Sequence, residues 1–302
     1  MASKGTVGVV GTGIMGAPMA VNLAKAGYDV VAFNRTPAKA EAIAGERIRV
    51  ARSVAEVGSA APIVITMVPD TPDVLEAVEG PGGLAGSMAA GSVLIDMSTI
   101  APGATRELAA RLRERGIAML DAPVSGGSWG AQEGTLTIMA GGEQGVFERC
   151  LPVLEAMGKS ITLMGPSGMG QTTKLVNQIL VAGTCSAVAE ALVFAAAHGA
   201  DLLKTIEAVG AGAAGSWQLA NLGPRMVKGD FAPGFMVKLQ QKDLRLILES
   251  AQEKHVPLAV TSLARAYYTA LEADGLGEEG TQALVKAVER PAGLEARQRA
   301  SG

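Results

Sequence analysis

Short runs of consecutive apolar residues alternate with amphipathic segments in the first half of the chain. These runs predict strands at 7–10, 30–34, 63–68, 93–97, 118–122, 136–140 and 161–164. Helical periodicity falls between several of them, as at 15–25 and 101–115. Strands without polar alternation are buried on both faces, which is typical of a mostly parallel sheet covered by helices on both sides. The connections 70–75, 80–86 and 126–134 are rich in glycine and proline, so we expect loops there.

The second half of the chain predicts helices and no strand. Helical patterns cover 170–197, 201–211, 216–228, 238–253, 257–273 and 277–289. The change of pattern falls at Gly165-Pro166-Ser167-Gly168, where glycine and proline interrupt the preceding strand. We therefore expect two domains, an α/β domain at 1–166 and an all-α domain at 167–302 that begins with a long helix. The polar end, 291–302, is expected to be irregular.

Charge and residue counts exclude several classes of function. The net charge of −3 gives no electrostatic basis for binding nucleic acid. Two cysteines, Cys150 and Cys185, are too few for a disulfide framework or a cysteine zinc site. Two isolated histidines, His198 and His255, do not predict a metal centre or a catalytic triad. Any catalysis is therefore expected to use other side chains or an organic cofactor, with no metal.

One apolar segment, 175–197, is long enough to raise the question of a membrane span. It carries Glu190 near its middle, and a carboxylate near a bilayer centre costs at least ~2.5 kcal/mol. We therefore expect a helix buried on all sides within a protein that contacts no membrane. The first residues lack the pattern of a secretory signal, so we expect a cytoplasmic location.

The run Gly11-Thr12-Gly13-Ile14-Met15-Gly16 lies between the first predicted strand and the first predicted helix. In such a run the first glycine allows a tight turn, the second admits a pyrophosphate, and the third lets helix and strand pack closely. The N–H groups at the helix start favour an anion. A glycine-rich turn also has a purely structural use, but its place between strand and helix favours a dinucleotide site.

The end of the second predicted strand bears on which dinucleotide binds. Asn34, Arg35 and Thr36 stand near the position where an NAD enzyme places a carboxylate on the ribose hydroxyls. No acidic residue is present there, and a guanidinium favours a 2′-phosphate. The residues therefore predict NADP(H) over NAD(H), the alternative being that Arg35 is only a solvated surface residue.

Two further runs contain candidate substrate-binding and catalytic residues. Ser125, Gly126 and Gly127 follow a predicted strand and could present a hydroxyl and backbone N–H groups to a carboxylate, although an ordinary turn has the same composition. Lys174 and Asn177 share one face at the head of the long apolar helix. Such a lysine either extends to solvent or lies in a cleft as a general acid.

Taken together, these motifs resemble those of the β-hydroxyacid dehydrogenase family, which includes 3-hydroxyisobutyrate dehydrogenases, tartronate semialdehyde reductases and glyoxylate/succinic semialdehyde reductases. The matching runs occur in the family's order and span nearly the whole chain: 11–16, 18–20, 34–36, 96–99, 121–127, 168–178 and 242–244. The resemblance implies a Rossmann-like domain with a doubly wound sheet, an all-helical domain, and homodimers or homotetramers formed through the helical domain.

The resemblance also implies roles for individual residues. Lys174 matches the family's catalytic lysine. Substrate binding is implied for Ser125, Gly126, Gly127, Asn177, Phe235 and Asp243. Cofactor binding is implied for Gly11, Gly13, Ile14, Met15, Gly16, Asn34, Arg35, Thr36, Met67, Val68, Pro69, Thr99 and Lys242.

Arg35 and the run 240–246 are most similar to the NADP-dependent glyoxylate/succinic semialdehyde reductases. The resemblance then implies hydride transfer between NADP(H) and a small semialdehyde or β-hydroxyacid, with 3-hydroxyisobutyrate- or serine-type dehydrogenases as the alternative. A non-catalytic NADP-binding module and an imine reductase are less favoured, because both usually lack a lysine at position 174. Two departures from the family pattern are Gln178, where many members carry a second asparagine, and the large Trp129 after the substrate loop.

Overall fold

The computed structural model describes residues 3–297, which form two compact units. Within the described residues, unit 1 comprises 3–174 and unit 2 comprises 175–297. Helix α9 (Met169–Ala197) is continuous across the boundary between them.

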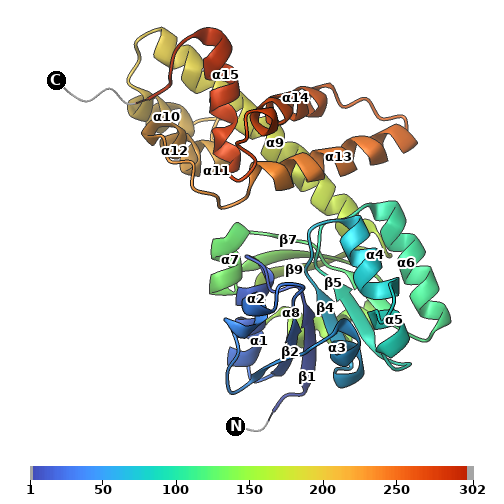
Figure 1. The fold of residues 1–302 in the computed structure, drawn as a ribbon. Helices are drawn as coiled ribbons and strands as arrows, with labels where there is room; N and C mark the ends of the chain where they lie inside the picture. Colours follow the sequence, from blue (N-terminus) through green and yellow to red (C-terminus); the bar gives the residue numbers. More distant parts are fainter. Residues whose placement is uncertain (1–2, 298–302) are drawn as a thin grey trace. The chain divides into compact units, whose positions relative to one another are not determined.

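Unit 1 is built on one nine-stranded sheet (Figure 1). Its strands are β1 (Thr6–Val10), β2 (Asp29–Phe33), β3 (Ile48–Val50), β4 (Ile63–Thr66), β5 (Val93–Asp96), β6 (Ala118–Asp121), β7 (Val124–Ser125), β8 (Leu136–Gly141) and β9 (Gly158–Gly165). The order is β3-β2-β1-β4-β5-β6-β8-β7, and β9 pairs with β8. All pairs are parallel except β8 with β6 and β7. The chain thus runs outward in both directions from β1, so the prediction of a doubly wound, mostly parallel sheet is confirmed.

Helices cover both faces of this sheet, as the apolar strands predict. The helices of unit 1 are α1 (Gly16–Lys25), α2 (Pro37–Glu41), α3 (Val54–Ala60), α4 (Thr71–Glu79), α5 (Leu84–Ser87), α6 (Pro102–Glu114), α7 (Gly127–Glu133) and α8 (Gln144–Leu154). Val7 and Val9 of β1 pack in one core cluster with α1 and α8, whereas Val10 packs in a second cluster with α3 to α6. Figure 1 shows α1 and α7 on one side of the sheet and α4 and α6 on the other. Alternating side chains of one strand therefore serve two separate cores.

Two strands and three helices of unit 1 differ from the sequence predictions. The sequence predicted neither β3 nor β7, which have three and two residues. The segments 70–75, 80–86 and 126–134 are loops in the sequence prediction, but they overlap helices α4, α5 and α7 in the structure. In α4, the Asp70 carboxylate accepts the N–H of Thr71 and a proline lies in the first turn, so residues typical of turns here begin a helix.

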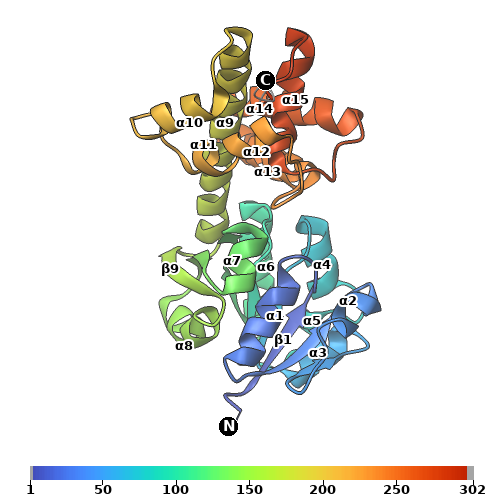
Figure 2. The same cartoon turned by 90° about the vertical axis from the view of Figure 1, so that its left-hand side faces the viewer.

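Unit 2 contains helices and no strand within its described residues, 175–297. Besides the remainder of α9 they are α10 (Leu202–Gly210), α11 (Trp217–Asn221), α12 (Gly223–Lys228), α13 (Val237–Glu253), α14 (Ala259–Ala273), η1 (Thr281–Ala283) and α15 (Leu284–Ala292). The predicted helix 216–228 is split before Pro224, which belongs to the first turn of α12. In Figure 2, α10 and α14 lie on different sides of α9.

The described part of the 291–302 segment is more ordered than the sequence suggested. Pro291 lies inside α15, and the N–H of Ala296 donates to the Glu289 carboxylate at 2.8 Å. The Arg297 guanidinium donates to the same carboxylate at 3.1 Å. Residues 298–302 lie outside the described part of the chain.

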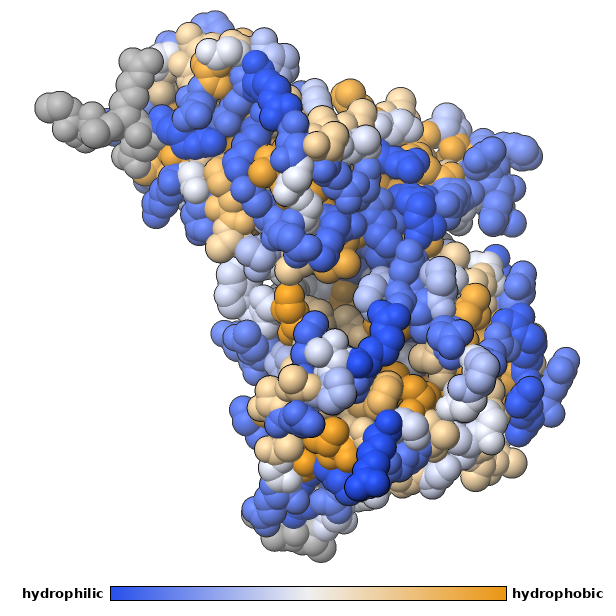
Figure 3. Space-filling model, in the orientation of Figure 1, coloured by the Kyte–Doolittle hydropathy of each residue, from blue (hydrophilic) through white to orange (hydrophobic). Residues whose placement is uncertain are grey.

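Helix α9 is not buried on all sides, contrary to expectation. It is the one described helix long and apolar enough by composition to cross a membrane, and 44 % of its most apolar 18-residue window is buried. Val176, Leu180 and Phe194 are 52 %, 65 % and 67 % exposed. A core helix of a soluble protein passes the same test of length and composition, so the composition of α9 is weak evidence for a membrane span. Figure 3 shows that hydrophilic residues dominate the visible face of unit 2 over α13 and α15.

Candidate active site

The glycine-rich turn between β1 and α1 is closed tightly against its neighbours. Gly11 has φ +99°, and a Cβ on it would lie 2.3 Å from the carbonyl oxygen of Met67. A Cβ on Gly16 would lie 1.9 Å from the carbonyl oxygen of Gly11. Both positions therefore require glycine, as the turn and the helix–strand packing predicted.

Gly13, between them, faces open space. No atom lies within 4 Å of the place that its Cβ would occupy, and Ile14 beside it is 56 % exposed. The first turn of α1 begins three residues later, with N–H groups that favour an anion. The turn thus fits a pyrophosphate lying over Gly13 at the start of α1.

The loop after β2 is tied to this turn by Asn34. Its Oδ1 accepts the N–H of Thr12 at 3.0 Å, and its Nδ2 donates to the carbonyl oxygen of Thr36 at 3.1 Å. The Arg35 side chain is 77 % exposed and forms an ion pair of 2.9 Å with Asp73 on α4. Asp29, the nearest acidic residue of β2, pairs instead with Arg47. Arg35 thus lies in a loop that Asn34 holds against the glycine turn, and its guanidinium is exposed.

The loops after β4 and β5 are joined to each other and to α9. The N–H of Val68 donates to the Ser98 hydroxyl at 3.0 Å. The fully buried Gln171 of α9 donates to the carbonyl oxygen of Ser98 at 2.8 Å and accepts the N–H of Ile100 at 3.1 Å. Gln171 therefore fixes both sides of Thr99, one of the predicted cofactor-binding residues.

The start of α9 is anchored by a carboxylate at the end of β6. Asp121 accepts the N–H groups of Gly168 at 2.8 Å and Gln171 at 2.9 Å, one on each oxygen. A Cβ on Gly170 would lie 2.3 Å from the carbonyl oxygen of Met139, so the helix begins directly against the backbone of β8. Burial raises the pKa of Asp121, and the donated N–H groups oppose that rise. Lys174 lies one turn beyond Gln171 and is only 7 % exposed.

A second buried carboxylate, Asp96, lies beside Asp121. The two residues are register partners at the ends of β5 and β6. Asp96 Oδ1 accepts the Thr66 hydroxyl at 2.8 Å and the N–H of Ser98 at 3.2 Å. Burial raises the pKa of Asp96 to about 6 and the charge of Asp121 adds to the rise, whereas hydrogen bonds from Ser98 and Thr66 oppose it.

Replacing Asp96 with asparagine should stabilise the protein in a pH-dependent way. The wild-type carboxyl binds its proton more tightly when folded, so it stabilises the fold below pH 4 and loses that contribution as the pH rises through about 6. An asparagine keeps a side-chain oxygen that accepts these hydrogen bonds from Thr66 and Ser98, and it does not ionise. The stability of Asp96→Asn relative to wild type is therefore expected to be about 3 kcal/mol higher at pH 8 than at pH 4. Urea unfolding at both pH values measures this.

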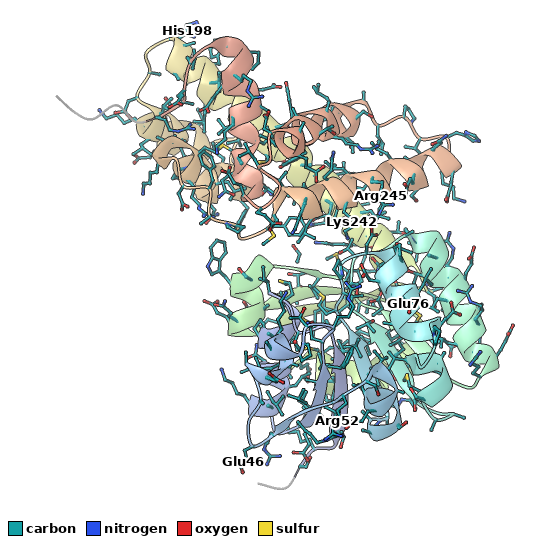
Figure 4. All side chains as sticks on the ribbon, viewed as in Figure 1. Glu46, Arg52, Glu76, His198, Lys242 and Arg245 are labelled. Carbon is teal, nitrogen blue, oxygen red and sulfur yellow. The ribbon has the colours of Figure 1, made fainter. Side chains whose placement is uncertain are left out.

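The matched control for that experiment is Glu76→Gln, which removes an exposed carboxylate from α4 (Figure 4). A stability difference between Asp96→Asn and wild type that stays constant from pH 4 to pH 8 would contradict a raised pKa at Asp96.

The predicted substrate loop spans the short β7 and the start of α7. Gly126 and Gly127 have φ values of +131° and +61°, so the backbone takes left-handed conformations directly after Ser125. Ser125 is partly buried, and Trp129 on α7 is 51 % exposed. This loop and Lys174 both belong to unit 1.

The other predicted residues lie in unit 2, where most of them form a connected polar chain. Asn177 Nδ2 donates to Gln178 Oε1 at 2.7 Å, and Gln178 Nε2 donates to Asp243 Oδ2 at 2.6 Å. Lys242 Nζ lies 2.7 Å from Asp243 Oδ1. Figure 4 shows Lys242 and Arg245 on α13. Phe235 is partly buried before α13, and its carbonyl oxygen accepts the N–H of Thr281.

Three of these polar residues, Asp121, Gln171 and Gln178, have no role in the sequence predictions. Asp121 opens the substrate-loop run, and Gln171 stands between glycines and the lysine, but their partners are 47 to 73 residues away. Gln178 was noted only as a departure from asparagine. The one signal in the sequence is that these polar residues stand within motifs expected to be buried. A buried polar group needs a hydrogen-bond partner, but the sequence does not show which residue that partner is.

Two family profiles and several known proteins match this chain over most of its length. Residues 6–165 match the family profile described as the NAD binding domain of 6-phosphogluconate dehydrogenase. Residues 168–288 match the profile described as NAD-binding of NADP-dependent 3-hydroxyisobutyrate dehydrogenase. The chain is 43 % identical to the 2-hydroxy-3-oxopropionate reductase of Escherichia coli over 94 % of its own length and 97 % of the relative's.

The chain belongs to the β-hydroxyacid dehydrogenase family.

Two solved structures support this assignment. The 3-hydroxyisobutyrate dehydrogenase of Salmonella typhimurium superposes with a TM-score of 0.85 at 31 % identity, covering 94 % of this chain and 99 % of that one. The 3-hydroxyisobutyrate dehydrogenase of Mycobacterium tuberculosis, solved with L-serine, gives 0.86 at 31 % identity, covering 95 % and 99 %. This β-hydroxyacid dehydrogenase is therefore an NAD(P)-dependent oxidoreductase, and the predicted family and fold class are confirmed.

Proposed function

We propose that this β-hydroxyacid dehydrogenase reduces a small aldehyde that carries a carboxylate, using NADPH, as glyoxylate/succinic semialdehyde reductases do. The observation that carries the proposal is Lys174, a buried lysine one turn beyond a helix start that Asp121 holds at the carboxyl end of β6 through the N–H groups of Gly168 and Gln171. The name of the Escherichia coli relative, a reductase of 2-hydroxy-3-oxopropionate, also describes an aldehyde with a carboxylate.

In this proposal each part of the chain has a chemical role. When bound, NADPH supplies the hydride that reduces the carbonyl carbon. The Lys174 ammonium donates a proton to the carbonyl oxygen as general acid; in the reverse direction the neutral amine is the base, so oxidation should rise with pH. Substrate contacts are assigned to Ser125, Gly126, Gly127, Asn177, Phe235 and Asp243.

The cofactor is assigned to the α/β domain at 1–166 and its loops, together with Lys242 from the second domain. The pyrophosphate would lie at Gly11, Gly13, Ile14, Met15 and Gly16. The ribose and 2′-phosphate would lie against Asn34, Arg35 and Thr36. The loop of Met67, Val68 and Pro69 would lie under the other ribose, and Thr99 and Lys242 would lie near the nicotinamide. The domain at 167–302 would supply the remaining substrate contacts.

Arg35→Ala should remove most of the preference for NADPH. A charge-assisted hydrogen bond is worth about 1.5–3 kcal/mol, so the dissociation constant of NADPH is expected to rise about 10- to 100-fold, while that of NADH changes little. Fluorescence titration with both cofactors measures this. Arg52→Ala, which removes an exposed arginine (Figure 4), is the control. An equal loss for NADPH and NADH would count against a 2′-phosphate contact.

An initial-rate panel tests the substrate. Glyoxylate, succinic semialdehyde, methylmalonate semialdehyde and tartronate semialdehyde should be assayed with NADPH and NADH. The highest kcat/KM on glyoxylate or succinic semialdehyde with NADPH supports the proposal.

Higher rates on methylmalonate semialdehyde, or on L-serine in the oxidative direction, would favour the alternative, a 3-hydroxyisobutyrate- or serine-type dehydrogenase. Serine is a specific candidate for that alternative, because the Mycobacterium tuberculosis relative was solved with L-serine. Affinity for NADPH without turnover would favour a non-catalytic module.

We also propose that this dehydrogenase is a cytoplasmic homodimer or homotetramer assembled through unit 2. Exposed apolar side chains follow one stripe of α9, including Val176, Leu180 and Phe194. Val260 and Leu263 of α14 are 66 % and 52 % exposed, and Val260 lies 3.5 Å from the Cβ position of Gly183 on α9. Contiguous apolar surface of this kind favours association. Light scattering of the purified chain gives the number of subunits.

A further inference from the structure

The polar chain of unit 2 links two helices through a carboxylate. Asp243 of α13 is 1 % exposed and Gln178 of α9 is 3 % exposed. One carboxylate oxygen of Asp243 lies 2.7 Å from Lys242 Nζ, and the other accepts Gln178 Nε2 at 2.6 Å. Asp243 therefore presents its oxygens to protein groups.

The charge of Asp243 fixes the direction of the hydrogen bonds. An ionised carboxylate accepts hydrogen bonds but donates none, so Gln178 turns its NH2 group toward Asp243. Gln178 Oε1 then points the other way and accepts Asn177 Nδ2 at 2.7 Å. Because the NH2 group of Asn177 donates to Gln178, the Oδ1 of Asn177 can accept a hydrogen bond from another group. The carboxylate of Asp243 on α13 thus determines that Asn177 on α9 keeps its Oδ1, and not its NH2 group, for a further hydrogen bond.

The identity of residue 178 matters for this connection. Glutamine is one methylene longer than asparagine. That added length carries the amide from α9 to the carboxylate on α13 while its oxygen still reaches Asn177. An asparagine at 178 would shorten the reach by about 1.5 Å, which exceeds what hydrogen bonds of 2.6 and 2.7 Å tolerate.

We propose that Asp243 and Gln178 are positioning residues that make Asn177 a hydrogen-bond acceptor at the reaction centre. Asn177 lies three residues after Lys174 on the continuous helix α9, so both occupy one face. The Oδ1 of Asn177 accepts a hydrogen bond from the proton donor of the reaction, the Lys174 ammonium. The inference rests on the proposed role of Lys174. In it, Asp243 does not contact the substrate but acts through Gln178.

Asp243→Asn tests the polarity directly. The new side chain directs its oxygen to Lys242 and its NH2 group to Gln178. The Gln178 amide then flips and donates to Asn177 Oδ1, so that Asn177 directs its NH2 group toward Lys174 instead of its oxygen. We expect kcat/KM for the aldehyde to fall about 10- to 100-fold, with NADPH affinity within twofold of wild type. Glu249→Gln, which removes an exposed carboxylate paired with Arg245 on the same helix, is the matched control and should keep full activity.

Rescue separates this mechanism from loss of structure. In Asn177→Asp/Asp243→Asn, residue 177 is an acceptor whatever its neighbour does, and the reversed Gln178 donates to it. The double variant should recover at least tenfold over Asp243→Asn. No recovery, or a loss in Asp243→Asn no larger than in Glu249→Gln, overturns the proposal. If Asp243→Asn does not fold, Gln178→Met serves instead: it keeps the length without the amide and should show the same loss.

A readout independent of turnover separates this proposal from the proposed function. The side-chain NH2 protons of Asn177 and Gln178 should exchange slowly with solvent in wild type and at least tenfold faster for Asn177 in Asp243→Asn, as measured by NMR. Equal exchange would refute the connection itself. Slow exchange in wild type together with full turnover in Lys174→Ala would instead refute the catalytic role of Lys174 and leave the connection standing.

Discussion

Lys174→Ala is expected to lower kcat for aldehyde reduction by about a thousandfold, the middle of the range for losing a general acid. The side chain is 7 % exposed, so no bulk water readily replaces its proton at the same place. NADPH binding should persist, because the glycine turn and Arg35 lie on other elements of unit 1. Steady-state rates together with a fluorescence titration of NADPH separate the two effects.

Two further variants sharpen that test. Lys174→Arg keeps the charge but holds its proton too tightly to donate it, so its kcat should stay low. Lys204→Ala removes an exposed lysine of α10, whose side chain is 83 % exposed, and should leave kcat unchanged. Turnover near wild type in Lys174→Ala would remove this residue from the catalytic role.

Gly16→Ala and Gly13→Ala should fail in different ways, which makes the pair a test of the nucleotide site. The methyl group of Gly16→Ala would lie 1.9 Å from the carbonyl oxygen of Gly11, so the turn has to open. Overpacking against backbone costs about 3 kcal/mol. Cofactor binding should be lost as well, because the closed turn is what directs N–H groups toward the pyrophosphate.

Gly13→Ala meets no atom within 4 Å and requires no left-handed backbone, so its unfolding free energy should stay within about 0.5 kcal/mol of wild type. Its methyl group would nevertheless occupy the space assigned to the pyrophosphate, and NADPH affinity is expected to fall at least tenfold. Thermal unfolding and titration of the same samples measure both quantities. Full NADPH affinity in Gly13→Ala would place the cofactor elsewhere.

Local features determined much of what the sequence predicted. The glycine turn, the strand before it and the helix after it lie within twenty residues, so turn chemistry and apolar periodicity identify them together. The same is true of the long helix that carries Lys174. Where a short element depends on its neighbours, as β3 and β7 do, the sequence contained too few residues for a period to appear.

Helix starts were the commonest error, and the cause is local. Asp70 and Pro72 are typical of turns, yet the same residues cap a helix when the following apolar side chains find a core. Val74 and Val78 do find one, against the sheet face that also buries Leu94. The residues that start α4 are therefore ambiguous until that packing is known.

The sequence by itself determined the family, the doubly wound sheet and which residues are candidates for chemistry, because these follow from patterns within a few turns or strands. Only the tertiary structure decided how those candidates are held. Asp121 anchors α9 across 47 residues, and Gln178 meets Asp243 across 65. Such contacts depend on which faces pack together, and periodicity along the chain contains no information about the partner that a buried polar group will find.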